Sequence, residues 1–191
     1  MSNLTILKRT IKDFKRSWSV ALIASLPLNL LPSVFIFDKT VGLLFFLILS
    51  GPLRTILSRT TLLITQQKLI KTEEIFSGFI SFKNALGVFL LSLVFIVLGG
   101  LLFIVPGIII AIWLSQSFFI MVQYPSLEPM EVFKKSKEMM KGNELKYINL
   151  FLLFFSFSVI ILYFNLLFLS ILIAPIQYIA FAHFYNSIDK K

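Results

Sequence analysis

The chain has 191 residues, of which 58% are hydrophobic and 14% are charged, whereas soluble domains average about 25% charged residues. This composition excludes a single soluble domain, because a domain of this size still exposes much of its surface to water. The chain has no cysteine, which excludes disulfides, thiolate metal sites and cysteine nucleophiles.

The first patterned segment, 4–18, is predicted to form an amphipathic helix. At about 100° per residue, basic side chains cover one side of the helical wheel. The opposite arc is apolar and consists of Leu4, Leu7, Ile11, Phe14 and Trp18. We expect this helix to lie in the membrane interface. The apolar run after it is a full span without a small-residue cleavage site, so it is not a signal peptide, and the mature chain is expected to begin at or near Met1.

Six apolar runs, uncharged except for Arg54 and Arg59 in the second, are predicted to be transmembrane helices. At about 1.5 Å per residue, each comes near the ~30 Å of a bilayer's hydrocarbon core. The sequence therefore predicts an all-α, polytopic membrane protein with six spans. The runs are 19–37, 41–63, 85–104, 108–124, 147–164 and 166–183, and the breaks within successive pairs are expected at Asp38-Lys39, Val105-Pro106-Gly107 and Asn165.

The positive charges fall on one side of this topology. With the N-terminus inside, only Lys39 of the 18 lysines and arginines lies outside. Such asymmetry predicts that both termini are cytoplasmic. The net charge of +9 is explained in the same way, because the basic residues lie in short loops that face anionic phospholipids. Nucleic acid is therefore not an expected partner.

Two further surface helices are predicted before the third and fifth spans. The segment 72–83 is weakly amphipathic, with Phe76 and Phe79 on its apolar side. The segment 128–141 is strongly amphipathic. Ser126 is its expected N-cap, and Gly142-Asn143 is its expected stop signal. Its apolar arc holds Val132, Phe133, Ser136, Met139 and Met140, and its polar arc holds Lys134, Lys135, Lys137, Lys141, Glu131 and Glu138.

The first and third surface helices align at an offset of 126 residues, with 6–10 matching 132–136. A single membrane domain, 1–191, could thus contain three repeats of a surface helix followed by a helical hairpin, over 1–70, 71–125 and 126–191. The alternative is that short basic amphipathic helices resemble one another without common origin.

Several short motifs resemble a family of uncharacterised bacterial integral membrane proteins, common in Gram-positive bacteria. The membrane domain of some bacterial glycerophosphoryl diester phosphodiesterases is more distantly similar. The resemblance implies a multi-pass protein of the bacterial cytoplasmic membrane and brings no established activity. The motifs are Gly51-Pro52-Leu53, Ile75-Phe76 with Gly78-Phe79, Val105-Pro106-Gly107-Ile108, KSKEMMKGN over 135–143, and Phe184-Tyr185.

Arg54 and Arg59 are the charges nearest the bilayer interior. They are either ordinary interfacial arginines whose side chains reach the surface, or a pair that binds a lipid phosphate or an anionic substrate. Lys134, Lys137 and Lys141 are further candidate contacts for anionic lipid.

Two glycine–proline pairs are candidate hinges. Pro52 follows Gly51 in the middle of the second span, and Gly107 follows Pro106 between the third and fourth. Proline removes a backbone hydrogen bond and bends a helix, although tight helix packing explains such pairs equally well.

No catalytic or metal-binding set is recognisable. His183 is the only histidine, and no carboxylate within a span is available to partner it. We therefore expect a non-enzymatic protein without a cofactor: an accessory, scaffold or immunity-type protein that acts through helix packing and anionic lipid, with other membrane proteins or a membrane-active peptide as potential partners. The alternative is a small transporter or lipid-handling protein that uses kinked helices and Arg54 and Arg59.

Overall fold

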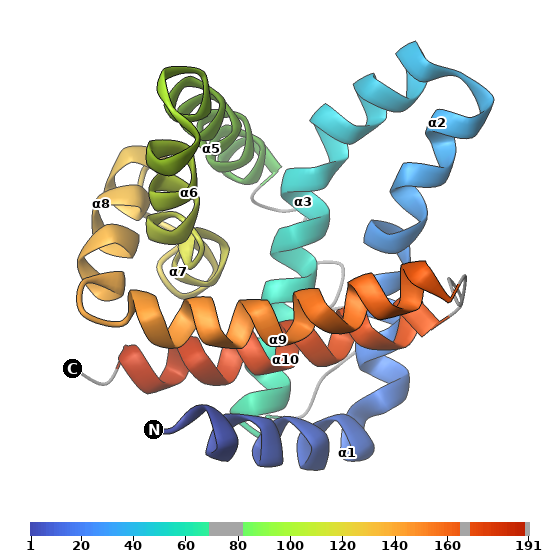
Figure 1. The fold of residues 1–191 in the computed structure, drawn as a ribbon, viewed down its shortest axis with the longest axis vertical. Helices are drawn as coiled ribbons and strands as arrows, with labels where there is room; N and C mark the ends of the chain where they lie inside the picture. The colour runs from blue at the N-terminus through green and yellow to red at the C-terminus, as the bar shows by residue number, and fades with distance from the viewer. Residues whose placement is uncertain (69–81, 165–168, 190–191) are drawn as a thin grey trace.

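The computed structural model describes residues 1–68, 82–164 and 169–189, and this part of the chain is helical without any strand. Six helical stretches are long and apolar enough to cross a membrane, which confirms the predicted fold class. The elements, drawn in Figure 1, are α1 (Asn3–Leu30), a 3₁₀ turn η1 (Leu31–Ser33), α2 (Val34–Phe37), α3 (Lys39–Thr65), α5 (Phe82–Leu102), α6 (Ile104–Trp113), α7 (Ser117–Gln123), α8 (Pro129–Met140), α9 (Glu144–Tyr163) and α10 (Ser170–Ile188).

Helix α1 combines the first surface helix and the first span. Its backbone leaves helical geometry at Ser17 (φ −129°, ψ 29°), close to the expected boundary. The first half packs along α10 and runs beneath the antiparallel pair α9 and α10 in Figure 1. Leu4, Ile11 and Trp18 are 55–63% exposed, so much of the predicted apolar arc is free of protein contacts and available to lipid.

The first two breaks between spans lie at or near their predicted places. Asp38 begins α3, where its Oδ1 accepts a hydrogen bond from the Val41 N–H at 2.8 Å. The second break is at Phe103, where the backbone is extended, a little before the predicted Val105-Pro106-Gly107. Pro106 instead lies in the first turn of α6, where a missing N–H breaks no helical hydrogen bond. The third predicted break, at Asn165, lies outside the described residues.

The fourth span is interrupted, contrary to the continuous helix predicted over 108–124. The chain leaves the helix after Trp113 and resumes it at Ser117. Ser115, Gln116 and Ser117 supply polar side chains at this point, and such side chains compete with the backbone for helical hydrogen bonds. Gln116 Nε2 donates to Ser115 Oγ at 2.9 Å, and Gln116 is fully buried.

The surface helix predicted over 128–141 is α8, but its N-cap is Glu128 rather than Ser126. The backbone N–H of Glu128 donates to Glu131 Oε2 at 2.9 Å, and Pro129 occupies the first helical position. Gly142 has a φ of +79°, which confirms the stop signal. The segment 72–83 lies outside the described residues except for Phe82 and Lys83, which begin α5.

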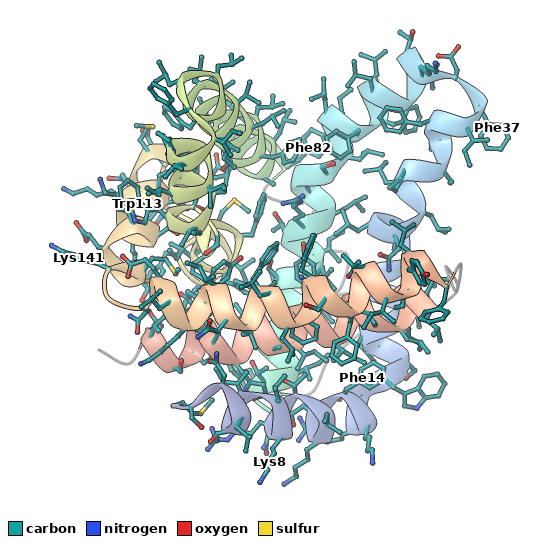
Figure 2. All side chains as sticks on the ribbon, viewed as in Figure 1. Lys8, Phe14, Phe37, Phe82, Trp113 and Lys141 are labelled. Carbon is teal, nitrogen blue, oxygen red and sulfur yellow. The ribbon has the colours of Figure 1, made fainter. Side chains whose placement is uncertain are left out.

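The main core lies where α5, α7, α8, α9 and α10 meet, and Ile6 of α1 and Leu62 of α3 also belong to it. Apolar side chains at the far turns are exposed instead: Phe37 is 88% exposed and Leu101 77%. Figure 2 shows Phe37 at the upper right, and Lys8 and Lys141 at the lower and left-hand edges. A broad apolar surface of this kind is the part of a membrane protein that contacts lipid.

Candidate functional site

Arg54 lies about 22 Å along α3 from its first residue, well inside the apolar part of the helix. Its guanidinium carbon is 5.6 Å from the ring centroid of Phe89 and 5.9 Å from that of Phe118. Its Nε is buried without a hydrogen-bond partner, and no carboxylate of the described residues pairs with it. The structure thus holds a cation between two aromatic faces, with no anion among the described residues to neutralise it.

Polar groups surround this arginine. Ser50 and Ser58 lie one helical turn before and after Arg54 on the same face of α3, and both have buried hydroxyls without partners. The hydroxyl of Tyr147 of α9 lies in the neighbourhood of both Arg54 and Ser115. The helix interruption and Arg54 therefore belong to one polar region inside the bundle.

Arg54 and Arg59 do not form a pair. Helix α3 is continuous across both, so five residues at about 100° each place their side chains roughly 140° apart. Only Arg54 contacts Phe89 and Phe118. Of the two candidate arginines, Arg54 is therefore the one placed to meet a ligand inside the bundle.

The two glycine–proline pairs lie at close helix contacts. A Cβ at Gly51 would lie 2.4 Å from the carbonyl oxygen of Ala85 in α5. A Cβ at Gly107 would lie 2.8 Å from the backbone nitrogen of Gly100. Both glycines let two backbones approach, which is the packing role considered for them. Pro52 lies inside α3, which bends in Figure 1. Whether these positions also act as hinges stays a prediction.

His183 has a carboxylate partner that the sequence analysis did not foresee, because Asp13 comes from the surface segment of α1 and not from a span. Asp13 Oδ2 is 2.9 Å from His183 Nε2, and Asp13 Oδ1 is 3.3 Å from Arg16 Nη2. Asp13 and His183 are 5% and 6% exposed. Asp13 lies opposite the apolar arc on the helical wheel, among the basic residues of the segment 4–18. It is buried because Ile6, Thr10 and Asp13 form the face of α1 that packs on α10.

Asp13 and His183 line a hollow of about 940 Å³, whose lining also includes Met1 and Asp189 near the two ends of the described chain. The first half of α1 and the ends of α3, α7 and α10 form its walls. Polar contacts hold these walls together: Arg16 Nη2 donates to the Ile64 carbonyl at 2.8 Å, and Asn186 Nδ2 donates to Thr65 Oγ1 at 2.9 Å. The hollow was not foreseen because its residues come from four distant segments.

The lysines of α8 lie on a helix whose apolar face is covered by protein. Val132, Phe133, Ser136 and Met140 are buried, and Ser136 Oγ donates to the Trp113 carbonyl at 2.6 Å. The predicted apolar arc is therefore correct, but it contacts other helices of the bundle. Lys137 Nζ lies 4.3 Å from the Trp113 ring centroid, and Lys134 and Lys141 are exposed.

Among the described residues, no three histidine, aspartate or glutamate side chains are grouped so that they could hold a metal ion. No protein family, curated protein or solved structure matches the chain. The resemblance noted in the sequence therefore remains a prediction.

Proposed function

We propose that this polytopic membrane protein is a non-enzymatic accessory or scaffold protein that acts through helix packing and contact with anionic phospholipids. Protection of the membrane against a membrane-active peptide is one form that this role would take. The resemblance to uncharacterised bacterial membrane proteins favours the bacterial cytoplasmic membrane, with both termini inside.

The observation that carries this proposal is the basic surface of α8. Phe133 packs edge-to-face on Phe95 with ring centroids 5.9 Å apart, so α8 is fixed to the bundle. Its exposed lysines, Lys134, Lys137 and Lys141, are thereby held on one side of a stable helix. Basic groups beside a membrane attract anionic headgroups by about 1 kcal/mol each.

The test compares two triple variants in nanodiscs that contain phosphatidylglycerol and phosphatidylcholine. K134Q/K137Q/K141Q removes the charges, and K134R/K137R/K141R keeps them. Native mass spectrometry of the ejected protein should show that the glutamine variant has lost its enrichment in phosphatidylglycerol, whereas the arginine variant keeps it. Equal enrichment in both variants and in the parent would contradict the proposal.

A second candidate, lipid handling, is favoured by Arg54. A cation inside the bundle without a carboxylate partner among the described residues is suited to meet a phosphate group in transit. The probe is fluorescent phosphatidylglycerol in vesicles that contain the protein, with movement between leaflets as the readout. Arg54→Gln should slow this movement while the matched variant Arg59→Gln does not. If both variants behave as the parent does, lipid handling through Arg54 fails.

A further inference from the structure

We propose that the hollow lined by Asp13 and His183 is a binding site for a phosphate-bearing group. This proposal does not depend on the function proposed above, which concerns the lysines of α8 and Arg54. None of those residues lines the hollow.

The charge of the hollow favours an anion. Arg9, Lys12 and Lys68 line it, and none of the three pairs with a carboxylate of the described residues. Of the two acidic residues of the lining, Asp13 pairs with Arg16 and His183, whereas Asp189 accepts a hydrogen bond from the neutral Gln123 Nε2 at 2.8 Å and keeps its charge. Within the described residues, the cationic side chains of the lining therefore outnumber the uncompensated carboxylate, and a phosphate would neutralise the excess.

The cations of α1 are held in position by the opposite face of the same helix. Ile6 and Thr10 are 1% and 0% exposed, so the backbone that carries Arg9 and Lys12 is fixed against the bundle. Asp13 adds its contact with His183 to this anchoring. A preorganised set of charges binds a ligand at a lower cost in conformational entropy than charges on a loose loop do.

His183 offers the hollow a further polar group. Its Nε2 is directed at Asp13, and its second ring nitrogen has no partner within the part of the chain that the structure describes. With Nε2 bonded to the carboxylate, the second nitrogen is available to a phosphate oxygen or to its proton.

Gln67 lines the hollow from a strained backbone position at the end of α3. Gln67 has a φ of +56°, in the left-handed region that glycine adopts most easily at the end of a helix. Gln67 N–H donates to the Ile64 carbonyl and Lys68 N–H to the Leu63 carbonyl, as in the usual glycine-containing helix end. A glutamine is strained there, yet its side chain lines the hollow. Local strain is retained where the side chain serves a purpose.

The experiment measures binding by isothermal titration calorimetry with the full chain in a neutral detergent. One arm uses inorganic pyrophosphate, and the other uses a short-chain phosphatidic acid. R9Q/K12Q should weaken binding about tenfold or more, since charge-assisted hydrogen bonds to phosphate are lost. K8Q/K15Q is the matched control, because Lys8 and Lys15 are exposed on the same helix but do not line the hollow. It should stay within about twofold of the parent.

Gln67→Gly provides a variant that cannot fail through misfolding of this turn. It should raise the melting temperature and yet weaken binding, because glycine relieves the strain and removes the amide. Binding in the pyrophosphate arm indicates a free phosphate ligand, and binding only in the lipid arm indicates a headgroup. The proposal is overturned if the parent binds neither probe, or if R9Q/K12Q and K8Q/K15Q lose affinity equally. The triple variants of α8 should bind both probes as the parent does. The proposal for the hollow and the proposal for the lysines of α8 can therefore be refuted independently.

Discussion

A Cβ atom on Gly51 would lie 2.4 Å from the carbonyl oxygen of Ala85, a backbone atom that cannot move aside without shifting a helix. Gly51→Ala should therefore lower the free energy of unfolding in detergent micelles by about 1–3 kcal/mol, the usual cost of overpacking. Gly100→Ala is the control, since its Cβ would meet nothing within 4 Å. That variant should be neutral or more stable by up to about 1 kcal/mol. A Gly51→Ala protein as stable as the parent would mean that α3 and α5 do not approach this closely.

The contact between Asp13 and His183 should be measurable as an energetic coupling. Asp13→Ala and His183→Ala each leave a buried polar group unpaired, which costs about 1–3 kcal/mol. In the double variant, the second substitution lowers the free energy of unfolding by less than it does in the parent, because its partner is already absent. A double-mutant cycle should therefore give a coupling of about 1–3 kcal/mol. Unfolding by denaturant in mixed micelles supplies the four free energies. Additive single effects would show that the two side chains do not interact.

Arg54 should reduce stability, as unneutralised charges inside a bundle do. A charge in the membrane interior costs about 2.5–3.5 kcal/mol, whereas cation–π contacts such as those with Phe89 and Phe118 return about 0.5–2 kcal/mol. Arg54→Met should thus raise the free energy of unfolding by about 1 kcal/mol. Arg59→Met should change it by less than about 0.5 kcal/mol, because Arg59 lies nearer the helix end. Thermal melts in nanodiscs compare the stability of both variants with that of the parent. An Arg54→Met protein less stable than the parent would contradict this prediction and assign Arg54 a structural role.

Phe133 should be an anchor of α8. It is 5% exposed and packs on Phe95, so Phe133→Ala should cost about 3–5 kcal/mol. Lys134→Ala, on the exposed side of the same helix, should stay within about 0.5 kcal/mol of the parent. The backbone amides of α8 should exchange with solvent faster in Phe133→Ala than in the parent, and at the parent's rate in Lys134→Ala. Unchanged exchange would mean that lipid, rather than protein, holds this helix.

The two ends of the molecule should be accessible from opposite sides of the membrane. Phe37→Cys lies at a turn where the side chain is 88% exposed, and Lys134→Cys lies on the exposed side of α8. In a chain without other cysteines, an impermeant thiol reagent applied to intact cells should label only Phe37→Cys. Labelling of both variants from the same side would contradict the proposed topology.

Local patterns were sufficient to predict the elements of this fold. The apolar runs predicted six spans, and the wheel of α8 gave the correct buried face because side chains on one helix follow a fixed period. The aligned positions Ile6 and Val132, like Thr10 and Ser136, are all buried, so the two surface helices use corresponding faces. Whether they are repeats remains a prediction.

Two features were not predicted from the sequence. The contact between Asp13 and His183 joins distant residues, and the interruption of the fourth span arises where polar side chains compete for backbone hydrogen bonds. The pairing of Asp13 with His183 was not predicted, because the helical wheel of one segment contains no information about a residue 170 positions away. The interruption at Ser115–Gln116 was overlooked because the apolar residues on either side dominate any average over the run. Three consecutive polar residues were the available signal.

The packing of α1 on α10 bears on how the chain is assembled during synthesis. The face of α1 that carries Ile6, Thr10 and Asp13 packs mainly on α10, and Asp13 contacts a residue 170 positions later in the chain. At about 5–20 residues per second, a ribosome needs roughly 10–30 s to make the intervening 170 residues. Helix α1 is therefore synthesised well before the helix that it packs on, and until then a chaperone or the bilayer surface must accommodate its buried aspartate.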